Sequence, residues 1–213
     1  MNSCVRKCVH GGTSIYNYEI LTPIGSLEVE ACFIGLHKLK FKEVLREEVF
    51  SNVSKKKNRF LVKENCSLEC VKLVDNHLTC NKEVILPLLD YLNYFFSYCL
   101  NQSNYVSYIK KNNEISSICW SSVCAKDSFT EKVLKALCNQ TIGSTITYKN
   151  LGLLAGNQNA QRAVGSVMRK NPICLIIPCH RVIKSGDNNI GNYSGGVEIK
   201  EWLLRYEKNF IKD

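Results

Sequence analysis

The sequence has no long apolar run. No stretch approaches the roughly 18 residues that cross a bilayer, which excludes a membrane-spanning helix. Its first ten residues lack the apolar core of a secretory signal, so we expect no entry into the secretory pathway. The 12 cysteines are scattered and do not have the regular spacing of a secreted disulfide framework. We therefore expect mostly reduced thiols in a cytosolic or nuclear protein.

The charge is basic and unevenly distributed. The formal net charge is +9, and residues 119–213 carry 13 Lys and Arg against 7 Asp and Glu. An excess of positive charge in this half suits a polyanionic partner such as DNA. A basic protein that is merely soluble is the alternative.

The first part of the chain predicts a small α+β domain over residues 1–114. Three β-rich segments, 15–20, 26–33 and 36–41, are separated by turn residues at 22–25 and 34–35, which predicts an antiparallel sheet. Residues 84–100 have helical spacing with one apolar face. Residues 51–63 are a charged connector, either a solvated loop or a nuclear-import patch.

Residues 115–213 predict a second, mostly helical domain. Ser128 and Glu131 form a capping box, and Thr147 caps a second helix that ends at Gly156-Asn157. A third helix over 160–169 ends before Asn171-Pro172, and a fourth spans 197–207. The second and third helices form a helix-turn-helix of winged-helix type, although many helical hairpins bind nothing.

A thiol and an imidazole are adjacent in Pro178-Cys179-His180-Arg181-Val182. This stretch follows the apolar run 173–177, which we expect to be a buried strand. A cysteine nucleophile needs a base, and the base needs a third group that orients it. We assign these roles to Cys179, His180 and Glu207, the last residue of the fourth helix.

From Ser128 to Glu207 the sequence resembles the DNA-repair alkyltransferases that act on O6-alkylguanine. The resemblance covers about half the chain, with weaker matches at 23–37 and 91–95 and none over residues 44–82. It implies an α/β fold. The main matching runs are 128–130, 146–148, 154–157, 162–165, 168–169, 171–172, 177–182, 191–196 and 200–204.

The resemblance implies repair by direct, irreversible transfer. The alkyl group of O6-alkylguanine, and that of O4-alkylthymine, would move to Cys179 of a monomeric protein after the base has flipped out of duplex DNA. The partner is double-stranded DNA, contacted in the minor groove, with no membrane involved. No cofactor takes part in the reaction, and the expected location is the nucleus, with the cytoplasm left open.

Further roles follow from the resemblance. Tyr148 would protonate the guanine and crowd the phosphate, or would only pack. Arg162 would fill the vacated base stack, or would contact a phosphate. Ala160, Gln161 and Met168 belong to the same DNA-binding helix, with packing the alternative for Met168. Gln161 and Ser166 stand where smaller residues are common, which leaves the depth of docking open.

The resemblance also implies a hinge and a binding loop. Asn171 would be the hinge between the helix and the active-site strand. In the loop 191–196, Gly191 lets the main chain approach the base, Tyr193 walls the alkyl pocket and the Ser194 N–H meets O6. The main-chain carbonyls of Cys179 and Val182 would accept from the guanine amino group. The segment 183–191 is one residue longer than in the best-known members, which leaves the pocket width open. Arg181 and Lys200 are expected to pair with nearby carboxylates.

Some family members hold a structural zinc ion in the N-terminal domain. Cys32 and His37 match two of its ligands, Trp120 stands in place of the later histidine, and Cys119 and Cys124 are close by. Cys4 and Cys8, at a spacing that zinc ligands use, could complete the site. Unligated thiols are the alternative.

Two other functions are compatible with part of the sequence. One is a DNA-binding module that flags lesions without transfer, although relatives of that type lack the cysteine. The other is a Cys-His-Glu hydrolase acting on a small ester or amide, which would leave the helix-turn-helix and Arg162 without a role.

Overall fold

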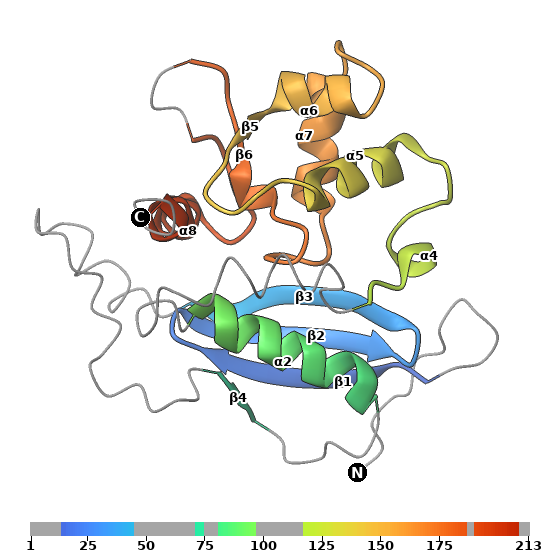
Figure 1. Cartoon of the computed structure of the whole chain (residues 1–213), viewed down its shortest axis with the longest axis vertical. Helices are drawn as coiled ribbons and strands as arrows, with labels where there is room; N and C mark the ends of the chain where they lie inside the picture. The colour runs from blue at the N-terminus through green and yellow to red at the C-terminus, as the bar shows by residue number, and fades with distance from the viewer. Residues whose placement is uncertain (1–13, 45–70, 75–80, 97–116, 187–189, 209–213) are drawn as a thin grey trace, which may run out of the picture. The chain divides into compact units, whose positions relative to one another are not determined.

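The computed structural model describes residues 14–44, 71–74, 81–96, 117–186 and 190–208 (Figure 1). The chain forms two compact units, Met1–Val123 and Cys124–Asp213. The division lies beyond the expected boundary at residue 115, because Ile118 forms a parallel bridge with Leu36 and so belongs to the first unit. Within the described residues, no helix has the length and apolar character needed to cross a membrane.

The first unit is built on an antiparallel sheet. Strands β1 (Tyr16–Thr22), β2 (Gly25–Cys32) and β3 (Gly35–Val44) pair in succession, which confirms the three predicted strands. A short strand, β4 (Lys72–Leu73), pairs with β1 and gives the order β3-β2-β1-β4. It lies within residues 44–82, where no strand was predicted.

One helix covers a face of this sheet (Figure 1). Helix α2 (Lys82–Phe96) begins two residues before the predicted start and contacts β2, whereas the predicted end at residue 100 lies outside the described residues. The predicted apolar face is buried. A four-residue helix, α4 (Trp120–Val123), ends the unit. The buried side chains of α2 are Val84, Ile85, Leu88, Tyr91, Leu92, Phe95 and Phe96.

The second unit contains the predicted helices. Helix α5 (Phe129–Cys138) begins after Ser128, whose side chain accepts from the Glu131 N–H at 3.1 Å. Glu131 in turn accepts from the Asp127 N–H. Helix α6 (Tyr148–Leu154) is capped by Thr147, and α7 (Gln161–Lys170) ends before Asn171, as predicted. Helix α8 (Val197–Lys208) completes the unit.

Helices α5, α6 and α7 pack on one another around apolar side chains. The turn between α6 and α7 passes through Gly156 at φ +88°, a left-handed conformation that glycine adopts without strain. Strands β5 (Ile146–Thr147) and β6 (Val182–Ile183) form a two-position parallel ladder that joins α6 to the segment after Cys179. The central buried residues are Val133, Leu134, Leu137, Leu151, Val164 and Leu203.

The predicted buried strand over residues 173–177 is wrong. The segment is buried, but it is folded into turns, with Leu175 at φ +65° and the Ile177 N–H donating to the Ile173 carbonyl. A single turn of 3-10 helix, Cys179–Arg181, follows it. Apolar composition indicated burial correctly, but a buried turn and a buried strand have the same composition.

Candidate active site

The second unit contains a pocket of about 730 Å³. Of the predicted site residues, Tyr148, Gln161, Arg162, Met168, Cys179, Tyr193 and Ser194 line it. His180, Glu207 and Asn171 are buried and do not line the pocket. Val182, Gly191 and Ala160 are also absent from the lining. The other lining residues are Lys149, Gly165, Ser166, Arg169, Lys184, Ser185 and Asn192.

Cys179 brings its sulfur to the pocket from the first position of the 3-10 turn. The residue is 4% exposed, and its Sγ accepts a hydrogen bond of 3.0 Å from the Asn171 side-chain amide. Burial raises the pKa of the Cys179 thiol, while the Asn171 hydrogen bond and the Lys200 ammonium oppose that shift. The sulfur is therefore held as a thiol at rest, in a setting that can stabilise a thiolate once the proton is removed.

Asn171 connects the end of α7 to this turn. Its amide nitrogen also donates to the Ile177 carbonyl at 2.9 Å, and its oxygen accepts from the Ile173 N–H at 3.1 Å. Asn171 thus lies between α7 and the turn that carries Cys179, and its side chain satisfies main-chain groups of that turn, while its role as a hinge stays a prediction. The contact with the sulfur was not anticipated, because it depends on the turn that replaces the expected strand.

His180 and Glu207 form a buried hydrogen bond. His180 Nε2 lies 2.7 Å from Glu207 Oε1, and neither side chain is exposed. Burial acts to raise the pKa of Glu207, but His180 and Arg181 outweigh it and lower this pKa to about 2. Burial lowers the pKa of His180. Because Glu207 is a carboxylate, it can only accept, so the proton of the neutral imidazole is on Nε2. Nδ1, which has no hydrogen-bond partner among the described residues, is left as a base.

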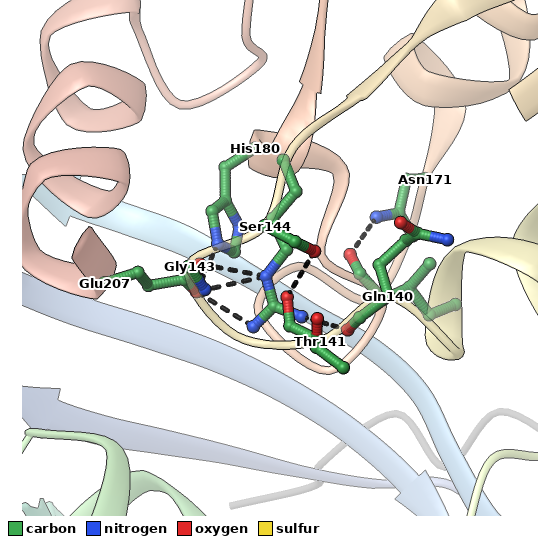
Figure 2. A network of polar contacts seen from close by, with 9 residues as sticks. Gln140, Thr141, Gly143, Ser144, Asn171, His180 and Glu207 are labelled. Atoms are coloured by element: carbon green, nitrogen blue, oxygen red, sulfur yellow. Dashed lines mark hydrogen bonds and ion pairs between the residues drawn. The ribbon is translucent and has the colours of Figure 1, made fainter. Parts of the chain in front are cut away.

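Arg181 is a principal partner of Glu207. Its Nε and Nη2 each donate to the carboxylate at 2.9 Å, and its Nη1 donates to the Gln140 carbonyl. The Gly143 N–H donates to Glu207 Oε2 at 3.1 Å (Figure 2). The expected pairing of Arg181 with a carboxylate is therefore present, and it is made with the acid that orients His180. In the sequence, the sign that Arg181 could bind this acid was its position next to His180.

Two tyrosines form part of the wall of the pocket. Tyr193 is edge-on to His180, with ring centroids 6.5 Å apart. Gly191 has φ +75°, and a Cβ there would lie 3.4 Å from Lys184 Cγ and 3.5 Å from the Tyr148 hydroxyl. These are ordinary van der Waals distances, so it is the positive φ, which other residues rarely adopt, that favours glycine here. Burial, followed by the charge of Cys179, raises the pKa of Tyr148, which keeps its hydroxyl protonated as a donor.

Lys200 differs from the expectation. Its ammonium is buried and donates to two main-chain carbonyls, those of Val182 at 2.6 Å and Asn192 at 3.3 Å, instead of to a carboxylate. Burial lowers its pKa to about 8. Lys200 therefore ties the binding loop to the turn that carries the thiol. The Cys179 carbonyl already accepts from the Val182 N–H, so each of the two predicted base-binding carbonyls has one lone pair left.

The first turn of α7 presents polar groups to solvent. Ala160 is its N-cap residue, and Gln161 and Arg162 follow it, both exposed. Met168, on the same helix, is 7% exposed and lines the pocket, so it is packed in the unit and also forms part of the pocket wall. The arrangement leaves Arg162 at the pocket rim with its side chain accessible.

The first unit contains a Cys-His-Cys cluster. The ligand atoms of Cys32, His37 and Cys119 all lie within 4.8 Å of one another. The Ile34 N–H donates to Cys32 Sγ at 3.4 Å, and burial lowers the pKa of His37, which favours the neutral imidazole that metals bind. Cys119, one of the two thiols noted beside Trp120, joins the two predicted ligands Cys32 and His37. Cys4 and Cys8 lie outside the described residues.

Comparison with known proteins finds that the second unit is similar to one family. Residues 128–209 match the DNA-binding domain of 6-O-methylguanine DNA methyltransferase. Over 87 residues the chain is 54% identical to the methylated-DNA–protein-cysteine methyltransferase of Rattus norvegicus, and over 86 residues it is 51% identical to that of Homo sapiens. Each match covers 40% of this chain and 41% of the relative, so the chain spans less than half the length of these relatives.

A solved structure extends the likeness of fold to nearly the whole chain. The O6-methylguanine methyltransferase of Mycobacterium tuberculosis superposes with a TM-score of 0.59 at 23% identity, over 93% of this chain and 96% of that one. The mixed α/β fold, with an antiparallel sheet and helices, is thus the one that the sequence predicted.

Proposed function

We propose that this protein, whose residues 128–209 match the DNA-binding domain of 6-O-methylguanine DNA methyltransferase, repairs DNA by moving an alkyl group from guanine O6 to Cys179. The single observation that carries the proposal is the position of Cys179. Its sulfur reaches a pocket in that domain, beside a buried His180–Glu207 hydrogen bond of 2.7 Å.

The transfer is a displacement at carbon. The Cys179 proton passes through a water molecule to Nδ1 of His180, and the carboxylate of Glu207, which Arg181 holds in place, stabilises the resulting imidazolium. The sulfur then attacks the alkyl carbon, a carbon–sulfur bond forms, and the carbon–O6 bond breaks with its electron pair going to the guanine. Tyr148 supplies the proton that makes the guanine a better leaving group. The thioether is stable, so each protein molecule acts once.

The target base must leave the duplex to reach Cys179. Unstacking costs a few kcal/mol, and Arg162, exposed at the rim of the pocket, would fill the space that the base leaves. We place α6 and α7 against the minor groove as a helix-turn-helix, with the exposed start of α7 closest to the bases. The same pocket would admit O4-alkylthymine. The expected monomeric state and nuclear location remain predictions.

The Cys-His-Cys cluster suits a structural zinc ion. Two sulfurs and one imidazole nitrogen are the donors that tetrahedral structural zinc prefers. Cys32, His37 and Cys119 would hold the ion, so that only one of Cys4 and Cys8, which were both predicted as ligands, would be needed as the fourth. The ion would have no part in the transfer, since the proposed chemistry needs only the side chains of the second unit.

The test is a titration with excess duplex oligonucleotide containing O6-methylguanine. We expect transfer to stop at one equivalent, with the added mass of a methyl group on Cys179 by peptide mass spectrometry. Cys179→Ser should transfer nothing, whereas Cys138→Ser, which changes an exposed thiol at the end of α5, should behave as wild type. Continued turnover would indicate a hydrolase instead, and tight DNA binding without transfer would indicate a lesion-flagging module.

A further inference from the structure

The rim of the pocket is strongly cationic. Four lining residues are positively charged, namely Lys149, Arg162, Arg169 and Lys184, and none is Asp or Glu. The proposed function gives Arg162 a role in the base stack and leaves Arg169 and the two lysines without one. Both lysines are exposed, and neither forms an ion pair with any described residue.

The β5–β6 ladder brings the two lysines to one place. Thr147 pairs with Ile183 in parallel register, so Tyr148-Lys149 and Lys184-Ser185 leave the ladder side by side at the same end. The side chain of Lys184 packs beside Gly191. A Cβ built on Gly191 would lie 3.4 Å from Lys184 Cγ and 3.5 Å from the Tyr148 hydroxyl, so these two side chains are close to each other.

We propose that Lys149 and Lys184 form a phosphate clamp on the DNA strand that delivers the base. A nucleotide whose base enters the pocket past Tyr148 must bring its flanking phosphates to the rim, and the two lysines are the cations that leave the ladder there. Binding these phosphates would hold the rotated backbone in place while Cys179 reacts. This inference rests on the proposed function, because it assumes that a nucleotide of DNA occupies the pocket.

The clamp predicts that loss of the lysines slows the reaction of Cys179 with duplex DNA but not its reaction with a free base. The free base O6-benzylguanine has no phosphate, so its transfer to Cys179 should be within twofold of wild type in Lys149→Gln, Lys184→Gln and the double variant. Reaction with duplex DNA should slow by about fivefold for each lysine, the upper range for an exposed ion pair. The dependence of log binding on log salt should become less steep by about 0.9 for each lysine.

Matched variants control for charge and for folding. Lys208→Gln removes an exposed cation of the same unit at the end of α8, outside the pocket, and should leave the rate and the salt slope unchanged. Lys184→Arg keeps the charge and should retain the wild-type rate on DNA.

Three results would overturn the clamp: an unchanged salt slope in the double variant, an equal loss in Lys208→Gln, or an equal loss with the free base. If wild type reacted with neither the free base nor the alkylated duplex, the proposed function would be refuted instead. The salt slopes for binding would still decide whether the lysines contact phosphates.

Discussion

The buried carboxylate of Glu207 makes the stability of the second unit depend on pH in a calculable way. Its pKa is about 2 in the folded protein, against an ordinary value of 4.5. A lowered pKa means that the ionised group stabilises the fold above pH 4.5 and that this stabilisation is lost as the pH falls through about 2. At about 1.4 kcal/mol per pKa unit, ionised Glu207 contributes on the order of 3 kcal/mol at pH 7 and about 1 kcal/mol at pH 3.

The variant Glu207→Gln should therefore lose stability mainly near neutral pH. It leaves the guanidinium of Arg181 buried without a counter-charge, a change that typically costs about 3–5 kcal/mol. Urea unfolding of the full chain, followed by tryptophan fluorescence, should give a difference from wild type that shrinks by about 2 kcal/mol between pH 7 and pH 3. Glu201→Gln on the same helix breaks only an exposed pair with Arg205, so its difference from wild type should stay below about 1 kcal/mol. A Glu207→Gln difference that is the same at pH 7 and pH 3 would refute an ionised Glu207.

Three further predictions concern the nucleophile, its base and the cluster. Because burial lowers the pKa of His180, transfer should fall off with acid only below pH 6.5, and an inflection above that value in the pH–rate profile would contradict a neutral base. Asn171→Asp keeps an acceptor for the Ile173 N–H but places a carboxylate where an amide donates to Cys179 Sγ, so alkylation by O6-benzylguanine should slow about tenfold or more, while a rate equal to wild type would remove Asn171 from thiolate stabilisation. Purified wild type should hold about one zinc ion by mass spectrometry under native conditions, Cys119→Ser should hold much less and Cys138→Ser as much as wild type, and a wild-type protein without zinc would mean that the cluster thiols are unligated.

The helices of the second unit were predictable because residues at or next to their ends set where they begin and end. Ser128 and Thr147 cap helices through their own side chains, and Pro172 prevents α7 from continuing. The pairing of His180 with Glu207 was also foreseen, since a base beside a cysteine needs a carboxylate and one stood at the end of a helix.

Other features depend on contacts that a linear pattern does not encode. The apolar run 173–177 looked like a strand because burial alone sets its composition, and only the tertiary structure holds Leu175 at a positive φ. Cys119 joins Cys32 and His37 through the bridge between Leu36 and Ile118, which joins segments far apart in the sequence. Strand β4 is two residues long, too short for any periodicity.

The ladder between β5 and β6 has a consequence for the order in which the second unit folds. Only two paired positions join the start of α6 to the end of the thiol-bearing turn, and they close a loop that contains the whole of α6 and α7. Contacts between residues this far apart form late, after the helices inside the loop, because closing the loop costs entropy before any pairing stabilises it. We therefore expect the segment that carries Cys179 to dock among the last steps of folding, so that a newly made chain gains the proposed transfer activity only once this ladder has closed.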